Sequence, residues 1–327
     1  MLKKIIKELL SYHKVGVFSH ERPDGDAIGS QIALTIWLQK NGVEAVPFNQ
    51  DEVPSNIKWL EDYLKIISPK KKLIDQCEAF VFIDGNRANR FGELGSYVFT
   101  TNKPRYLIDH HPDPDVESFD DTYSVMTASS SAELVYHVFD ASDPDLIDEA
   151  AAKALYTGIM TDTGSFRFES VTPEVHLIVA DLLRRGNFKP NEIHEKIYDD
   201  RTPDQMRLLG LALETVETFA DDQIGTITIT DKMLRDTHCT YADTEGFVSY
   251  PLSLAGTRAA VLFCELDGRI KLSLRTKSGI LANVWARLFG GGGHDRAAGA
   301  WHNGPLEAAK KEVIEAGMEQ LASLNTD

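Results

Sequence analysis

The chain has 327 residues, with 34 lysines and arginines against 50 aspartates and glutamates, and a formal net charge of −16. Charged residues make up 26% and hydrophobic residues 43% of the sequence, a balance that excludes an intrinsically disordered protein. The acidic excess argues against a protein that coats long duplex nucleic acid, which would need net positive charge. At about 100–200 residues per domain, the length predicts two domains.

The sequence has no pattern of export or of membrane insertion. Residues 1–10 have the pattern of an amphipathic helix with lysines, without the cleavage site of a signal peptide. No apolar run approaches the roughly 18 residues of a membrane span. The three cysteines form no C-x-x-C pair, so neither a disulfide framework nor a zinc ribbon is indicated. We therefore expect a cytoplasmic protein.

In the first half, short apolar runs alternate with helical patterns, which predicts an α/β fold with a mostly parallel sheet flanked by helices. The expected strands are 15–19, 45–49, 79–83 and 105–108. The expected helices are 27–39, 130–139, 148–160 and 173–185. A capping box from Ser130 to Glu133 opens the second of these helices, and Gly186 closes the last.

The second half predicts a smaller α+β domain. After the polar stretch 187–203, we expect a helix over 204–219, a strand over 224–230, a hairpin of 259–266 with 269–276 around Asp267-Gly268, and helices over 283–289 and from Pro305. The predicted organisation is a catalytic domain over 1–186, a linker over 187–203 and a substrate-binding domain over 204–327. Residues 255–299 carry seven basic and three acidic side chains, a local charge of +4 that could attract an anionic substrate.

Acidic and histidine side chains follow three of the predicted strands and one helix: HERPDGD (20–26), Asp84, Asp109-His110-His111 and Asp162. In open α/β sheets, ligand sites lie outside the carboxyl ends of the strands, so we expect these groups to meet at one edge. A mixed set of Asp and His suits Mn²⁺, whereas a set of Asp alone favours Mg²⁺ or Ca²⁺. Two metals about 3.5–4 Å apart need a bridging carboxylate and suit phosphoryl displacement.

The run Gly290–Gly293, followed by His294, is the second chemical signal. It is not a P-loop, because no Gly-Lys-Ser/Thr follows, but its backbone N–H groups could approach an anion. Arg275, at the end of a strand, could bind phosphate as a fork. A flexible turn and a surface charge are the alternative interpretations. The hydroxyls of 129–131 are interpreted as helix caps, since no Gly-x-Ser-x-Gly motif is present.

Taken together, HERPDGDAIGS, FIDGN, IDHHP and GIMTDTGSF resemble the four motifs of the DHH phosphoesterase superfamily. SLRTKSG, followed by NVWARLFGGGGHDRAAG, resembles the C-terminal DHHA1 domain of that superfamily. The resemblance covers almost the whole chain. The two-domain length is similar to that of the NrnA-type branch of bifunctional oligoribonucleases and 3′-phosphoadenosine-5′-phosphate (pAp) phosphatases.

The resemblance implies two sets of metal ligands that share Asp84 as a bridge. The first cation would be held by His20, Asp24 and Asp84. The second would be held by Asp26, Asp84, His110 and Asp162. The implied cofactors are two divalent cations, Mn²⁺ with Mg²⁺ as the alternative.

The resemblance also implies the roles of the remaining motif residues. His111 would contact the scissile phosphate and protonate the leaving oxygen, and Asp109 would orient His111. In the DHHA1 domain, the substrate would be bound by Arg275, Thr276, Gly291, Gly292, Gly293 and His294. Thr276 stands where serine is more usual in the superfamily.

We therefore expect a hydrolase, a phosphodiesterase and 3′(2′),5′-bisphosphate nucleotidase, that converts short oligoribonucleotides to mononucleotides and pAp to AMP through metal-activated water. The expected partners are short single-stranded RNA or nucleotides, with no membrane and no long duplex. The oligomeric state is open, with a homodimer among the alternatives. The alternative functions are a cyclic di-AMP or linear dinucleotide phosphodiesterase and a non-catalytic nucleotide sensor.

Overall fold

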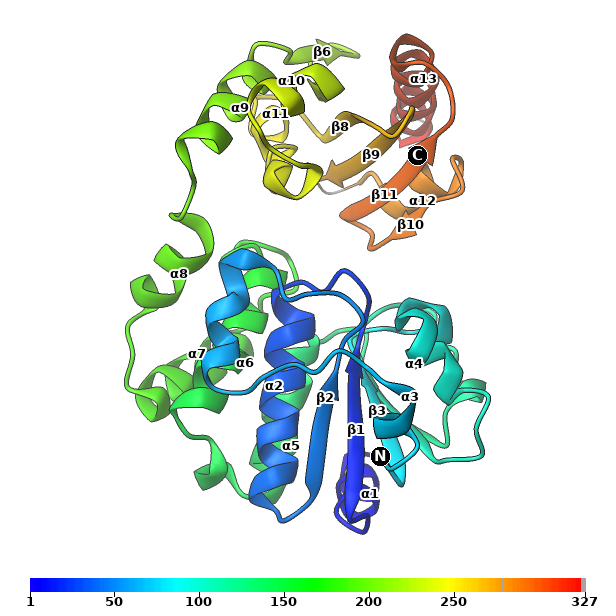
Figure 1. The fold of residues 1–327 in the computed structure, drawn as a ribbon. Coiled ribbons are helices and arrows are strands. Elements are labelled where there is room, and N and C mark those ends of the chain that lie inside the picture. The colour runs from blue at the N-terminus through cyan, green and yellow to red at the C-terminus, as the bar shows by residue number, and fades with distance from the viewer. Residues whose placement is uncertain (278, 325–327) are drawn as a thin grey trace. The chain divides into compact units, whose positions relative to one another are not determined.

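The computed structural model describes residues 1–277 and 279–324, and the chain divides into two compact units, Met1–Asp200 and Arg201–Asp327. Each unit has its own sheet and its own hydrophobic core (Figure 1). Among the described helices, none combines the length and the apolar character that crossing a bilayer requires.

The first unit is built on five parallel strands in the order β2-β1-β3-β4-β5. The strands are β1 (Lys14–Ser19), β2 (Glu44–Phe48), β3 (Ala79–Ile83), β4 (Arg105–Asp109) and β5 (Asp121–Ser124). The predicted α/β fold with its parallel sheet is confirmed. β5 is an addition to the prediction: it pairs only with β4 at the edge, and its half-buried sequence DTYS lacks the apolar run that marks the other strands.

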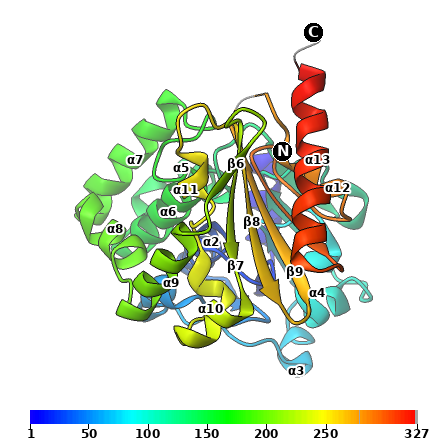
Figure 2. The same ribbon diagram turned by 90° about the horizontal axis from the view of Figure 1, so that it is seen from above.

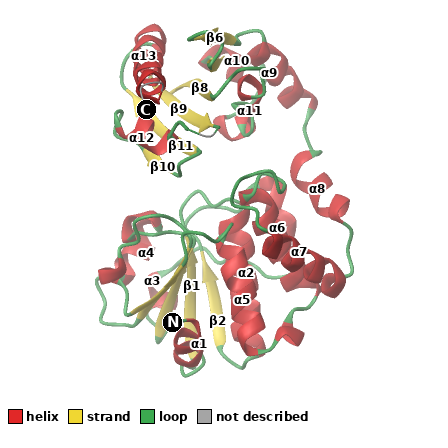
Figure 3. Ribbon diagram, turned by 180° about the vertical axis from the view of Figure 1, so that it is seen from behind, coloured by secondary structure: helices red, strands yellow, loops and turns green. Residues whose placement is uncertain are grey.

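Helices cover both faces of this sheet (Figures 1 and 3). On one face, Val15 and Val17 pack with α2 (Gly25–Lys40), α5 (Ser131–Ser142), α6 (Glu149–Asp162) and α7 (Pro173–Gly186). On the other face, Phe18 and Phe80 pack with α3 (Lys71–Ile74) and α4 (Gly92–Val98). The remaining helices of the unit are α1 (Leu2–Leu9), α8 (Pro190–Tyr198) and the 3₁₀ helices η1 (Ser55–Asp62), η2 (Ala88–Arg90), η3 (Val116–Ser118) and η4 (Pro144–Leu146).

The C-terminus of α7 differs in detail from the prediction. The left-handed residue that ends the helix is Asn187, with φ +48°, whereas Gly186 remains helical. A Cβ at Gly186 would lie 2.6 Å from the ring of Phe188 and 2.9 Å from Ala152, so the glycine is required for close packing. Asparagine tolerates the left-handed conformation better than most residues, which explains the cap.

Most of the stretch expected to be a linker, 187–203, belongs to the first unit. α8 buries Ile193 and Ile197 in the same core as Phe188. These two isoleucines are four residues apart, so they lie on one helix face that packs against the core. The division between the units falls between Asp200 and Arg201.

The second unit contains a mixed sheet of six strands in the order β10-β11-β9-β8-β7-β6. The strands are β6 (Glu217–Phe219), β7 (Ile224–Ile229), β8 (Ala259–Leu266), β9 (Arg269–Thr276), β10 (Gly292–Gly293) and β11 (Ala297–His302). The β8–β9 hairpin forms as predicted, because Asp267 and Gly268 both adopt positive φ, 51° and 75°. Figure 2 shows α12 and α13 beside β9.

The helices of this unit lie over both faces of its sheet. They are α9 (Pro203–Leu213), α10 (Asp231–Asp236), η5 (Tyr241–Thr244), α11 (Ser249–Leu252), α12 (Ala282–Arg287) and α13 (Leu306–Leu324). The helix expected over 204–219 ends at Leu213, and 217–219 forms β6 instead. The hydroxyl of Thr215 explains the break, because it lies 2.7 Å from the Ala212 carbonyl and 3.0 Å from the Thr228 carbonyl.

Candidate metal centre

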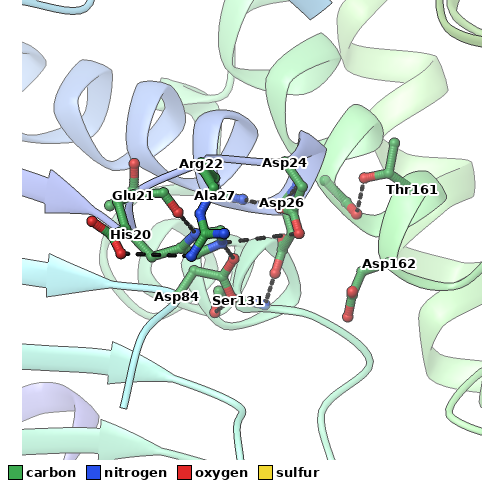
Figure 4. A network of polar contacts seen from close by, with 12 residues as sticks. His20, Glu21, Arg22, Asp24, Asp26, Ala27, Asp84, Ser131, Thr161 and Asp162 are labelled. Atoms are coloured by element: carbon green, nitrogen blue, oxygen red, sulfur yellow. Dashed lines mark hydrogen bonds and ion pairs between the residues drawn. The ribbon is translucent and has the colours of Figure 1, made fainter. Parts of the chain in front are cut away.

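The carboxyl edge of the parallel sheet gathers the acidic and histidine residues of the first unit (Figure 4). His20 follows β1, Asp84 follows β3, and His110 follows β4. Asp24 is the N-cap of α2 and Asp26 lies in its first turn, while Asp162 is the last residue of α6. All six residues expected to bind metal therefore come from the same edge.

Asp84 lies at the centre of this cluster. Its carboxylate oxygens are 3.4 Å from Nε2 of His20 and 3.6 Å from Nε2 of His110. Nδ1 of His111 is 3.7 Å from one of the same oxygens. The backbone of Asp84 is left-handed, with φ +58°, a conformation that aspartate tolerates better than most residues.

Three groups of candidate ligands contain Asp84. In the first, His20, Asp24 and Asp84 each place a ligand atom within 4.8 Å of the others, and in the second, Asp26, Asp84 and His110 do the same. Oδ2 of Asp162 lies 3.4 Å from Nε2 of His110 and extends the second group. The geometry therefore suits two cations with one carboxylate between them. A third group, formed by Asp84, Asp109 and His111, adjoins these two.

The imidazoles of His20 and His110 are oriented by backbone carbonyls. Nδ1 of His20 lies 2.8 Å from the Glu21 carbonyl, and Nδ1 of His110 lies 3.4 Å from the Ala128 carbonyl. A proton on each Nδ1 leaves the lone pair of Nε2 facing the carboxylates. This is the tautomer that a metal-binding histidine requires.

The N-terminus of α5 holds two of the carboxylates. Asp26 accepts the backbone N–H groups of Ser131 at 2.6 Å and of Ala132 at 2.9 Å. The hydroxyl of Ser131 donates to Asp84 at 2.9 Å. The positive end of the helix dipole thus lies against buried negative charge.

Burial and mutual repulsion set the pKa values of the acidic groups. Burial raises the pKa of Asp26 well above its ordinary value, and the charges of Asp84, Asp162 and Asp24 raise it further. The pKa of Asp162 rises for the same reasons, burial being the largest. Burial also acts to raise the pKa of Asp84, but contact with His20 and the nearby imidazoles hold it well below its ordinary value. Crowded carboxylates, of which Asp26 and Asp84 are buried, with imidazole lone pairs among them are a donor set that fits divalent cations.

Asp109 and His111 form a buried pair beside the cluster. Oδ1 of Asp109 is 2.8 Å from Nδ1 of His111, and Oδ2 accepts the backbone N–H of His111 at 3.1 Å. Burial, with the charge of Asp84, raises the pKa of Asp109 to about 7. Burial lowers the pKa of His111 to about 3. The hydrogen bond between Asp109 and Nδ1 therefore fixes the orientation of the His111 ring.

The residues expected to bind substrate lie together in the second unit. Arg275, in β9, is in register with Ala297 of β11, and β11 in turn pairs with Gly292 and Gly293. Burial lowers the pKa of Arg275, and one of its terminal nitrogens donates to the Leu274 carbonyl at 3.0 Å. The backbone N–H of His294 closes the turn by donating to Ala297 at 2.7 Å.

The fold itself accounts for Thr276 and Gly291, but not for the glycine at position 292. The buried hydroxyl of Thr276 lies 2.8 Å from the Ile280 carbonyl and 3.3 Å from the Asp295 carbonyl, so its proton serves the loop. A Cβ at Gly291 would lie 2.6 Å from that of Ala300, whereas a Cβ at Gly292 would meet nothing within 4 Å. The fold therefore requires glycine at position 291 but not at 292.

Sequence reasoning missed three residues that support the cluster. Ser131 was interpreted only as a helix cap. Asn49 donates from its amide to the His20 carbonyl at 2.9 Å and holds that loop. The carbonyl of Arg90, in η2, accepts the backbone N–H of Glu21 at 2.7 Å, beside His20. Ser131 had a detectable signal, a serine at a helix start beside acidic strand ends, but Asn49 and Arg90 had none.

Two family models match the sequence, one in each unit: the N-terminal domain of the DHH family over residues 14–159 and the DHHA1 domain over residues 229–322. The bifunctional oligoribonuclease and PAP phosphatase NrnA of Thermus thermophilus is 31% identical over 312 residues, which cover 93% of this chain and 89% of that protein. The chain belongs to the DHH family. This DHH protein is a phosphoesterase, and therefore a hydrolase, related to NrnA.

Further similarities extend over the whole DHH protein. NrnA of Bacillus subtilis is 25% identical over 303 residues, which cover 92% of this chain and 93% of that protein. The crystal structure of an exopolyphosphatase-related protein from Bacteroides fragilis has a TM-score of 0.90 and 28% identity, over 98% of this chain and 95% of that one. RecJ from Thermus thermophilus, in complex with Mn²⁺, has a TM-score of 0.55 and 12% identity, over 100% of this chain and 54% of that one, and shows a shared fold alone.

Proposed function

We propose that this DHH protein hydrolyses short oligoribonucleotides to mononucleotides and pAp to AMP. The proposal is carried by one observation: the buried carboxylate of Asp84 belongs both to the group with His20 and Asp24 and to the group with Asp26 and His110. Such an arrangement suits displacement at phosphorus. The substrates are proposed from the similarity to NrnA proteins, which extends over nearly the full length of both chains.

We assign the candidate ligands to two divalent cations. His20, Asp24 and Asp84 would hold one, and Asp26, Asp84, His110 and Asp162 would hold the other. The mixed imidazole and carboxylate donors favour Mn²⁺, with Mg²⁺ as the alternative. When bound, the cations would lower the pKa of water at the site and offset the negative charge of the phosphate.

The protein's own residues would position the phosphate and supply the proton that the leaving oxygen takes up. Protonated Asp109 would donate to Nδ1 of His111 and place the ring proton on Nε2, from which it would pass to the leaving oxygen as the proton of Asp109 moves to Nδ1. Ser131 holds Asp84 through its hydroxyl and Asp26 through its backbone, and so fixes both carboxylates. In the second unit, the guanidinium of Arg275, the glycine loop and His294 would bind the remainder of the nucleotide.

The test compares substrates in parallel. The protein, loaded with Mn²⁺, is assayed against labelled di- to pentaribonucleotides, pAp, cyclic di-AMP and pyrophosphate. We expect turnover of the oligoribonucleotides and of pAp, and loss of at least about 100-fold in Asp84→Asn. Asparagine also tolerates the left-handed backbone, so this variant removes the charge without straining the turn.

Asp221→Asn is the matched control, because Asp221 is exposed and also left-handed, with φ +52°. It should retain full activity. Hydrolysis of cyclic di-AMP alone would replace the proposed substrates with the cyclic dinucleotide. Tight binding of a nucleotide without any turnover would identify a sensor instead of an enzyme.

A further inference from the structure

A row of polar and aromatic side chains lies on the face of β9 and β11 opposite Leu272 and Leu274, which we call the outward face. Along β9, Ile270, Leu272 and Leu274 are buried in the core, and the residues between them point the other way. The outward residues of β9 are Arg269, Lys271, Ser273 and Arg275. We call Arg269, Lys271 and Ser273, together with Gly299 and Trp301 of β11, the outer strip.

The pairing of the strands makes the outer strip continuous with the predicted substrate site. Lys271 lies opposite Trp301, and Ser273 lies opposite Gly299. The next outward pair along the same strands is Arg275 and Ala297. Outward residues of one strand are about 7 Å apart, so the strip continues in a straight line away from Arg275.

Trp301 and its neighbours form a flat, cationic platform. The guanidinium carbon of Arg269 lies 4.3 Å from the centre of the Trp301 ring, and Nζ of Lys271 lies 5.1 Å from it. Trp37 and Trp285 are fully buried, whereas Trp301 is half-buried. Unpaired bases stack on aromatic rings and on arginine planes, and both surfaces are present here.

The backbone beside this platform is open to close approach. Gly299 is half-buried, and a Cβ there would lie 3.2 Å from Nζ of Lys271. Because Gly299 has no side chain, the ammonium of Lys271 can lie close to the backbone of β11. The hydroxyl of Ser273, 3.0 Å from that of Tyr241, offers a neutral hydrogen-bonding group between the cations.

The charge of the outer strip opposes that of the protein as a whole. The chain carries a net charge of −16, whereas the strip contributes two cations and is followed by Arg275. An acidic protein repels a polyanion in general, so a local row of cations favours an anionic chain at this place. Alternation of cations with an aromatic platform is the pattern that binds single-stranded nucleic acid.

We propose that the outer strip binds the nucleotides of a single-stranded RNA that lie beyond the nucleotide held at Arg275. Lys271 and Arg269 contact successive phosphates, and a base stacks on the platform of Trp301 and Arg269. The inference rests on the proposed function and deepens it, because it names the residues that favour an oligoribonucleotide over a mononucleotide.

The experiment separates long substrates from short ones. The activities of Trp301→Ala and of the double variant Arg269→Gln/Lys271→Gln are measured on a pentaribonucleotide and on pAp. We expect kcat/KM for the pentaribonucleotide to fall at least about fivefold in each, while that for pAp stays within about twofold. Trp301→Phe, which keeps an aromatic face, should lose less than Trp301→Ala. Lys232→Gln removes an exposed lysine of α10 in the same unit and should change neither activity.

Binding is measured separately, without turnover. The full-length protein, with metal chelated, is titrated into a labelled pentaribonucleotide and followed by fluorescence anisotropy. Loss of two phosphate contacts should flatten the slope of log affinity against log salt by about 1.4 in the double variant. Thermal melting of each variant checks that its fold is intact. A labelled acidic peptide of equal charge is titrated in parallel.

Several results would overturn the proposal. Equal losses of kcat/KM for pAp and the pentaribonucleotide would show that these residues act on every substrate or only stabilise the fold. Unchanged RNA affinity in both variants would show that the strip does not contact RNA. An acidic peptide that binds as tightly, through the same residues, would make the strip a protein-binding surface. Failure of the wild type to hydrolyse either substrate would contradict the proposed function, while the anisotropy titration would still decide whether the strip binds RNA.

Discussion

The carboxylate of Asp26 accepts the backbone N–H of Ser131 at 2.6 Å, although the two residues are 105 positions apart. This bond joins the first turn of α2 to the N-terminus of α5. The side chain of the same serine donates to Asp84 at 2.9 Å. Ser131 therefore fixes the distance between two carboxylates that we assign to the cations, without itself being a ligand.

The hydroxyl of Ser131 should be needed for metal affinity. Ser131→Ala removes the bond to Asp84 but keeps the backbone N–H that holds Asp26. We expect Mn²⁺ affinity, measured by calorimetry, and kcat/KM to fall about 10-fold or more, as for other groups that orient metal ligands. Ser129→Ala is the matched control, because the buried hydroxyl of Ser129 has no hydrogen-bond partner within residues 1–277 and 279–324. Equal Mn²⁺ affinity in the two variants would contradict this role.

Asp162 should destabilise the metal-free protein. Its pKa is raised well above 3.8, chiefly by burial, so at neutral pH its ionisation opposes folding. In chelator at pH 7, Asp162→Asn is therefore expected to raise the melting temperature. The gain should shrink as the pH falls and vanish below about 3.8, where the carboxyl is protonated in the unfolded chain as well.

Addition of Mn²⁺ should make the wild type more stable than Asp162→Asn. The wild type is expected to gain more stability from the cation than Asp162→Asn does, because it binds the cation more tightly. Melting curves with and without chelator, at several pH values, measure both effects. A variant that is less stable than the wild type in chelator at pH 7 would show that Asp162 is not under electrostatic strain.

Gly25 should be required for close approach of α2 to α6. A Cβ at this position would lie 2.9 Å from Cβ of Thr161, the residue before Asp162. Gly25→Ala should therefore separate Asp26 from Asp162 and lower kcat/KM by about 10-fold or more. Thr161→Ala, combined with Gly25→Ala, should restore part of the activity. Gly210→Ala is the control, because a Cβ there meets nothing within 4 Å and alanine favours helix.

Gly291 and Gly292 should respond differently to alanine. Gly291→Ala clashes with Ala300 and is expected to lower the melting temperature. Gly292→Ala is tolerated by the fold, so its melting temperature should stay unchanged. If the backbone at 292 approaches a phosphate, the added methyl group should instead raise KM several-fold. An unchanged KM in Gly292→Ala would remove this glycine from the proposed binding site.

Most of the candidate metal site could be predicted because it follows from one topological rule. Parallel strands end at the same edge, so His20, Asp84 and His110 had to lie near one another once their strands were recognised. The strands were recognisable because both of their faces are buried and their sequences are continuous apolar runs. The sequence DTYS of β5 lacks such a run, because an edge strand is only half-buried.

The other features of the site depend on how the helices and strands pack, which local sequence patterns do not encode. The close approach of Gly25 to Thr161 of α6 is not encoded in the local sequence around Gly25. The expected capping box at α5 is only half formed: Ser130 caps Glu133, but the carboxylate of Glu133 accepts the N–H of Ser129. The hydroxyl of Thr276 donates to the Ile280 carbonyl of its own loop, a contact that the sequence pattern does not reveal.

The central claim is that Asp84 lies between two cations. Anomalous diffraction from crystals grown with Mn²⁺ tests it most directly. We predict two anomalous peaks, one on each side of the Asp84 carboxylate, with His20 beside one and His110 beside the other. A single peak, or peaks that do not contact Asp84, would contradict the account.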